Sequence, residues 1–112
     1  MFVEDFVLRQ EPTSRQRDDL RIKVACPSLP DASTYEVQLR RAGFVVSHVE
    51  DMTRSWRDFT AERLSLFRAA RTRQIDVHGV DIVNGLDDFY ATVAGLFADG
   101  VVGGLRIRAR RE

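Results

Sequence analysis

Two pairs of adjacent carboxylates are the first residues of this sequence that could do acid–base chemistry. Glu4 and Asp5 lie in the β-favouring stretch that begins the chain, and Glu50 and Asp51 end a second such stretch. A carboxylate at a strand end can orient a substrate or accept its proton. An exposed strand end is the simpler interpretation of Glu4 and Asp5. Adjacent strand residues face opposite ways, so solvated charges are the simpler interpretation of Glu50 and Asp51 than a shared proton.

Three aromatic residues at helical intervals form the second group of candidates. Trp56 and Phe59 begin one amphipathic segment, and Tyr90 lies in another. Their rings could wall an apolar pocket, since aromatic side chains bury a large area while tryptophan and tyrosine keep a polar group. Aromatic residues at this spacing more often belong to a core, so both interpretations stay open.

Metal and thiol chemistry are not expected. Neither His48 nor His78 has a second histidine, cysteine or carboxylate at a metal-ligand spacing beside it. Cys26 is the only cysteine, which excludes an internal disulfide and suits an inert thiol in a reducing cytoplasm.

Arg106, Arg108 and Arg110 line one face of the last strand-like segment, where they could meet a phosphate or an acidic partner. A solvated or internally paired face is the simpler expectation. The candidate acidic mates are Asp51, Asp87 and Asp88.

Helices and strands that must position these residues follow one another along the chain. Alternation and β-favouring residues predict strands at 1–8, 20–25, 44–51 and 105–110. Apolar residues three and four apart predict helices at 33–42, 55–73 and 86–100, the first ended by Gly43. Ser33 with Glu36, and Ser55 with Asp58, have the spacing of capping boxes. We expect a loop at 9–19, a break at 26–30 and turns within 77–85.

Length and composition limit the organisation to a single domain, residues 1–112, of which 44% are hydrophobic. Lys plus Arg and Asp plus Glu are balanced at 17 each, so no net field favours nucleic acid or an anionic membrane. The sequence has no apolar run of about 18 residues and no charged-then-apolar leader. We therefore expect a soluble, cytoplasmic protein.

An ordered set of motifs runs along the chain. A helix reading Tyr35 to Ala42 leads through Gly43-Phe44 into a strand ending Glu50-Asp51, then Trp56, and finally a Gly103-Gly104 strand. This succession resembles the end of class I SAM-dependent methyltransferases of the sarcosine/dimethylglycine or ubiquinone-biosynthesis type. The resemblance spans this whole chain but only about the last two-fifths of the family pattern.

The resemblance implies an α+β fragment of a Rossmann-like fold, with about three strands in a mixed sheet and three helices packed on it. The closing strand would run antiparallel between the first strand and the Phe44 strand. It also implies that some side chains of this chain contact the methyl acceptor. The substrate-binding candidates are Asp5, Trp56, Phe59 and Tyr90, while no catalytic residue is identified.

The SAM-binding features of the family are absent from the sequence. In the family, a glycine-rich turn leads from a strand into a helix. In this sequence the glycine-rich stretch, Gly100 to Gly104, precedes a strand instead. We therefore expect no cofactor-binding residue in this chain, and SAM only if a partner supplies that half.

Three arrangements follow from this expectation. In a split methyltransferase, a SAM-binding partner chain would pair with the hydrophobic edge of the first strand. In a non-catalytic remnant, the same edge would join two copies, and a small apolar ligand would lodge among Trp56, Phe59 and Tyr90. The third arrangement is a fragment of a longer enzyme.

Overall fold

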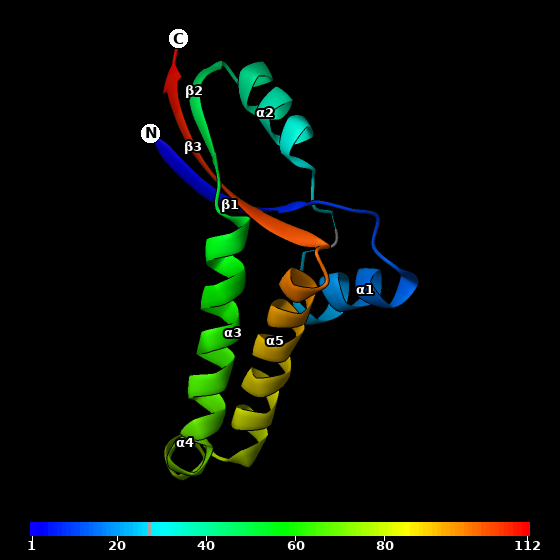
Figure 1. Cartoon of the computed structure of the whole chain (residues 1–112), viewed down its shortest axis with the longest axis vertical. Coiled ribbons are helices and arrows are strands. Elements are labelled where there is room, and N and C mark those ends of the chain that lie inside the picture. The colour runs from blue at the N-terminus through cyan, green and yellow to red at the C-terminus, as the bar shows by residue number, and fades with distance from the viewer. Residues whose placement is uncertain (27) are drawn as a thin grey trace.

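A three-stranded sheet forms one end of the molecule, and a helical arm projects from it (Figure 1). The computed structural model describes residues 1–26 and 28–112. The strands are β1 (Phe2–Leu8), β2 (Phe44–Asp51) and β3 (Val102–Arg111). Within the described residues the helices are α1 (Ser14–Asp18), the π-helical turn η1 (Asp19–Lys23), α2 (Ala32–Arg41), α3 (Thr53–Ala69), α4 (Arg71–His78) and α5 (Val80–Ala98).

The strand order is β1-β3-β2, so the closing strand lies in the middle, as the resemblance implied. Both pairings are antiparallel, with Asp5 opposite Leu105 in one and Asp51 opposite the same residue in the other. The α+β architecture is thus confirmed. The sheet is antiparallel throughout rather than mixed, because its outer strands, which run parallel to each other, both pair only with β3.

Helix α2 covers one face of the sheet. The Asp31 side chain caps its N-terminus by accepting a hydrogen bond from the Thr34 N–H at 2.8 Å, so the expected box of Ser33 with Glu36 is wrong. At its other end Gly43 takes a φ of +93°, a backbone conformation that suits glycine, and the chain turns into β2. Beneath α2 lies a cluster of buried residues, Val7, Leu105, Ile107 and Ala109.

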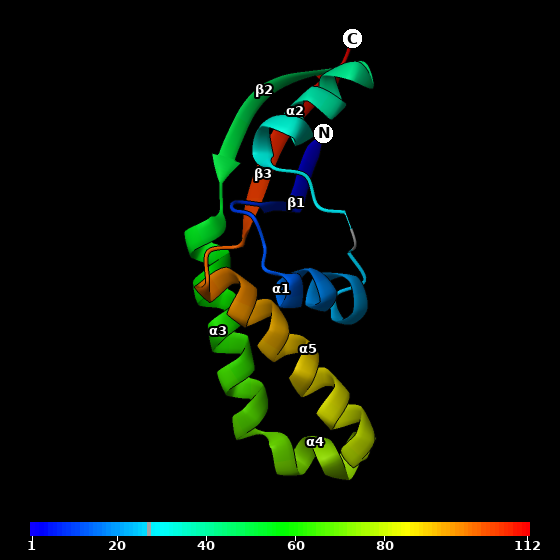
Figure 2. The same cartoon turned by 90° about the vertical axis from the view of Figure 1, so that its right-hand side faces the viewer.

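The second core joins the other face of the sheet to the base of the arm. It contains Leu20, Val93, Leu96, Phe97, Val101 and Val102. From there α3 and α5 run side by side, and α4 joins them at the far end (Figure 2). The molecule measures 51 × 30 × 21 Å, and its radius of gyration is 16.3 Å. A compact domain of this length would have a radius of gyration of about 13 Å, so the arm makes the molecule elongated.

The segment 9–25 differs from its prediction. The expected loop contains α1, which begins at a capping box formed by Thr13 and Gln16. The expected strand at 20–25 is wrong, because residues 19–23 form η1. Leu20 and Val24 alternate with polar residues, but they are also four residues apart and so share one side of a helical turn. Both pack in the second core, and that burial selects the helical conformation.

The long helix predicted at 55–73 also differs. It begins earlier, at Thr53, without a side-chain cap, so the expected box of Ser55 with Asp58 is wrong. It stops at Ala69, and α4 then turns the chain. Gly79, with a φ of +88°, makes the predicted turn after His78.

The second turn predicted in this region is wrong, because Asn84-Gly85 lie inside α5. Neighbouring Val83 is fully buried, and Arg71 of α4 donates to the Asn84 side chain at 2.5 Å. These contacts outweigh the turn preference of the pair. Within the predicted break at 26–30, residue 27 lies outside the described residues. No helix of the described ranges has the length and apolar character needed to cross a bilayer.

Candidate functional site

A hollow of about 370 Å³ lies where β1 meets the arm. Trp56, Phe59, Thr60 and Arg63 of α3 form one side of it. The remaining lining comes from β1 and α5, through Glu4, Asp5, Phe6 and Val93. Three of the four residues that the sequence suggested for substrate binding, Asp5, Trp56 and Phe59, therefore line one hollow.

The glycine pair of β3 allows Trp56 to lie at this hollow. A Cβ atom added to Gly104 would collide with the Trp56 ring, and one added to Gly103 would collide with the side chains of Thr53 and Arg9. The ring then packs edge-on against Phe6, with centroids 5.8 Å apart and planes at 88°. Gly103 and Gly104 thus serve close packing between β3 and α3.

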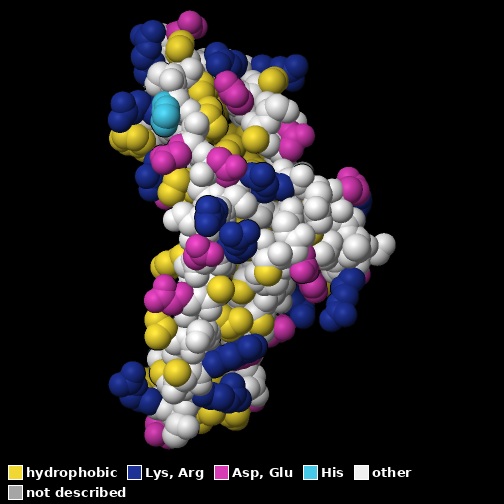
Figure 3. Space-filling model, in the orientation of Figure 1, with side chains coloured by type: hydrophobic (Ala, Val, Ile, Leu, Met, Phe, Trp, Pro, Cys, Tyr) yellow, Lys and Arg dark blue, Asp and Glu magenta, His cyan; other side chains and the backbone are white. Residues whose placement is uncertain are grey.

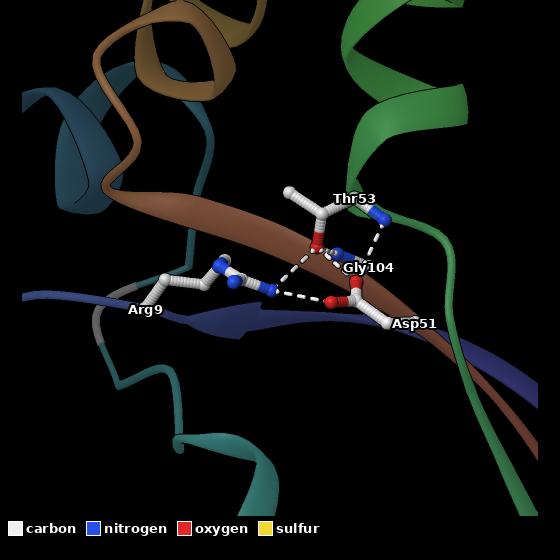
Figure 4. A network of polar contacts seen from close by, with 4 residues as sticks. All are labelled: Arg9, Asp51, Thr53 and Gly104. Atoms are coloured by element: carbon white, nitrogen blue, oxygen red, sulfur yellow. Dashed lines mark hydrogen bonds and ion pairs between the residues drawn. The ribbon is translucent and has the colours of Figure 1, made fainter.

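Polar contacts at the start of α3 fix the helix on the sheet (Figure 4). Asp51, the last residue of β2, accepts hydrogen bonds from the Thr53 N–H at 2.9 Å and from the Thr53 hydroxyl at 2.5 Å. Arg9 donates to the other Asp51 oxygen at 2.7 Å, and the Gly104 N–H donates to the Thr53 hydroxyl at 3.2 Å. The Thr53 hydrogen bonds, together with Arg9, lower the pKa of the Asp51 carboxyl to about 2.

The two carboxylates of β1 have different neighbours. Asp5 accepts hydrogen bonds from the Tyr35 hydroxyl of α2 at 3.0 Å and from the Phe6 N–H at 2.8 Å. The pKa of the Tyr35 hydroxyl is raised to about 12, mainly because the hydroxyl is partly buried and secondly because the Asp5 carboxylate is close to it. Glu4 faces the other side of the sheet and accepts a hydrogen bond from Arg106 of β3 at 2.8 Å.

Tyr90 of α5 lies in an adjoining hollow of about 480 Å³, which is otherwise lined by α3 and the start of α4 and shares Phe59 and Arg63 with the first. Its ring packs edge-on against Phe67, with centroids 5.1 Å apart. Tyr90 therefore belongs to a different hollow from Asp5 and Trp56, and Phe59 and Arg63 line both hollows.

Arg63 is a site residue that the sequence interpretation missed. Its guanidinium lies 4.4 Å from the Tyr90 ring centroid and 5.7 Å from that of Phe59. A signal was present, because Arg63 interrupts the apolar face of the long amphipathic segment. A charged residue in such a face indicates either a buried ion pair or a ligand contact.

The remaining candidates lie away from the hollow. His48 is exposed in β2 and His78 is exposed at the end of α4. No group of three metal-binding side chains occurs in the part of the chain that the structure describes.

The partners expected for the last-strand arginines are wrong. Arg106 pairs instead with Glu4 and Glu50, and Arg108 lies over the Phe2 ring. These partners stand directly opposite Arg106 and Arg108 on the neighbouring strands. Asp51 stands opposite Leu105 instead, and Asp87 and Asp88 belong to α5. The three aspartates expected as mates, Asp51, Asp87 and Asp88, pair with Arg9, Arg68 and Lys23.

Neither of the two described connections from β1 and β2 into the following helix contains a glycine-rich turn. The chain passes from β1 to α1 through Arg9–Thr13, which contains no glycine, and from β2 to α3 through Met52 alone. A nucleotide turn needs glycines that let backbone N–H groups approach the ligand. Gly103 and Gly104 lie within β3 instead.

The fold resembles parts of several solved structures. Mycolic acid cyclopropane synthase CmaA1, complexed with SAH and CTAB, matches 99% of this chain with a TM-score of 0.81 at 12% identity. The cyclopropane synthase MmaA2 from Mycobacterium tuberculosis matches 96% with a TM-score of 0.79 at 10% identity. Phosphoethanolamine N-methyltransferase 2 of Haemonchus contortus, in complex with phosphomonomethylethanolamine and S-adenosylhomocysteine, matches 98% with a TM-score of 0.81 at 14% identity.

The matches cover only part of those proteins: 44%, 42% and 26% of the three chains, respectively. No protein-family model and no curated protein matches the sequence. This chain therefore has the fold of a portion of these methyltransferase and cyclopropane synthase structures, including both the sheet and the helical arm.

Proposed function

We propose that this chain is the acceptor-side portion of a SAM-dependent small-molecule methyltransferase of the sarcosine/dimethylglycine or ubiquinone-biosynthesis type. A partner chain would supply the SAM site. The observation that carries the proposal is the hollow between β1 and α3, lined by Trp56 and Phe59, in a fold that spans less than half of the methyltransferase and cyclopropane synthase chains it matches.

The role of this chain would be to hold the acceptor. Methyl transfer depends chiefly on holding the acceptor atom in line with the methyl donor, and rigid aromatic walls restrict the positions that a bound molecule can take. Trp56 is suited to that task because Phe6 and Gly104 fix its ring. Asp5 would act at the margin of the hollow, since its carboxylate is engaged by Tyr35.

The outer edge of β1 is the surface proposed for the partner. The Leu8 N–H bonds the Pro30 carbonyl at 2.9 Å, and the Phe6 N–H is taken by Asp5, so the even-numbered residues turn their N–H groups outward. Apart from one bridge between Leu8 and Asp31, no described strand pairs with this edge. The outward N–H groups of Phe2 and Glu4 are thus left for a strand from another chain.

Apolar side chains also reach the surface along the arm, as the yellow atoms of Figure 3 show. Phe59 is 58% exposed and Leu66 is 64% exposed. A partner body placed against the β1 edge and the arm would cover them.

The test begins with affinity capture of the tagged chain from its host, followed by mass spectrometry and titration of SAM into the recovered complex. We expect a co-purifying chain that gives the complex SAM affinity, and we expect no such affinity when SAM is titrated into this chain alone. Glu4→Pro removes an outward N–H of β1 and should abolish the complex, whereas Glu4→Ala loses the same carboxylate and should keep it. Recovery of only this chain would contradict the split enzyme.

A second candidate function is a self-associating binding module, which the exposed apolar residues of the arm favour. Sedimentation velocity distinguishes the two, because the module predicts a stable homodimer in the absence of any other chain. If that dimer forms, Glu4→Pro shows whether the β1 edge holds it together.

A further inference from the structure

Arg63 is a charged residue without a counter-charge in a mostly apolar setting. Its Nε atom is buried and has no hydrogen-bond partner, and no carboxylate of the described residues lies within ion-pair distance of its guanidinium. The rings of Tyr90 and Phe59 flank it. Aromatic faces attract a cation, but they provide no acceptor for a buried N–H.

The carboxylates around the hollow are already engaged. Glu4 forms an ion pair with Arg106 at 2.8 Å, and Asp5 accepts hydrogen bonds from Tyr35 and Phe6. The Glu62 side chain lines the adjoining hollow but forms no ion pair with Arg63 among the described contacts. Arg63 therefore keeps a net positive charge at the wall between the two hollows.

The chemistry of the guanidinium group selects the missing partner. Its fixed N–H donors match two oxygens of a carboxylate or a phosphate, which form stronger hydrogen bonds to it than neutral acceptors do. The surrounding walls, formed by Phe6, Trp56 and Val93, are suited to an apolar body. A ligand that satisfies both parts carries an oxyanion at one end and an apolar group beside it.

We propose that Arg63 binds the oxyanion of such a ligand, with the apolar part lying between Trp56 and Phe59. The inference rests on the proposed function, because the ligand would be the acceptor that this chain holds. It narrows the acceptor to a molecule bearing a carboxylate or a phosphate.

Trp56 provides the readout, because it is the only tryptophan of the chain and lines the hollow. The purified full chain is titrated with octanoate, octyl phosphate, 1-octanol and octylamine below their micelle concentrations, while Trp56 fluorescence is followed. We expect the oxyanions to bind about tenfold more tightly than the alcohol, and the amine to bind most weakly. The affinities for octanoate and octyl phosphate, compared with each other, identify which oxyanion the site prefers.

Variants then assign the effect to Arg63. Arg63→Met should lose about tenfold in octanoate affinity and leave octanol binding unchanged. Arg63→Lys keeps the charge and loses the planar fork of N–H donors, so its octanoate affinity should lie between those of the wild type and Arg63→Met. Arg54→Gln is the matched control, since Arg54 is exposed on the same helix and lies outside the hollow. Circular dichroism of each variant checks that the arm is folded.

Equal affinity of the wild-type chain for octanoate and octanol would overturn the inference without any variant. Unchanged octanoate affinity in folded Arg63→Met would also overturn it. These titrations need neither SAM nor a partner chain, so failure of the capture experiment leaves their result intact. Conversely, a SAM-binding complex whose hollow shows no oxyanion preference would refute only this inference.

Discussion

The sheet end and the helical arm bury their apolar side chains to very different extents. In the sheet, Val7 and Ile107 are each 1% exposed, whereas Leu66 and Val77 of the arm are 64% and 70% exposed. Burial of apolar area is the main favourable term in folding, so the sheet end and the base of the arm supply most of the stability. The outer arm therefore keeps exposed apolar surface that is available for binding.

The largest effect is expected at the base of the arm. Phe97 is 2% exposed in the second core, and Phe97→Ala should lower the free energy of unfolding by about 3 to 5 kcal/mol. Phe59→Ala removes the same ring at a position that is 58% exposed and should cost well under about 1 kcal/mol. Urea unfolding measures both variants. Equal losses would show that the outer arm has a core of its own.

An intermediate effect is expected where the two regions meet. Gly104→Ala places a methyl group against the Trp56 ring, and the resulting displacement of α3 should cost about 1 to 3 kcal/mol. Gly85→Ala is the control, because Gly85 has open space around its Cα within α5 and alanine favours a helix there by up to about 1 kcal/mol. Thermal unfolding should therefore shift in opposite directions. A tolerated Gly104→Ala would mean that the Trp56 ring moves freely on the sheet.

The smallest effect concerns the polar contacts that join β2 to α3. The folded pKa of Asp51 is about 2, below the ordinary value for aspartate of about 3.9. Its contribution to stability is thus present above pH about 4 and is lost as the pH falls toward about 2. The carboxylate is 54% exposed, so the contribution should stay below about 1 kcal/mol.

Asp51→Asn isolates this contribution. The variant should be less stable than the wild type at pH 6, and the difference should vanish toward pH 2 in urea titrations. Asp58→Asn, on the exposed side of α3, serves as the control. A pH-independent difference would assign the effect to packing rather than to charge.

Local patterns predicted the sheet more successfully than the arm. The three strands that form follow β-favouring runs with clear turn signals such as Gly43, and local signals are decisive there. The segment around Leu20 and the pair Asn84-Gly85 carry local signals that tertiary packing overrides. Those packing partners are distant in sequence, so no local pattern contains them.

The candidate site was partly predictable for the same reason. Trp56 and Phe59 were found because aromatic residues on an amphipathic helix are visible in the sequence, and the structure brings them to one hollow. The engagement of Asp5 by Tyr35 depends on which face of the sheet α2 covers. Arg63 interrupts an apolar helical face in the sequence, but its lack of an acceptor becomes visible only when every neighbouring side chain has a position.

The fit between Gly104 and the Trp56 ring has an evolutionary consequence. Neither residue can change freely alone, because a larger side chain in the strand displaces the ring, and loss of the ring leaves a void above the glycine. Among relatives of this chain, the two positions should therefore vary together, with glycine retained wherever a large ring faces it. A substitution that looks neutral in one lineage would then be deleterious in another.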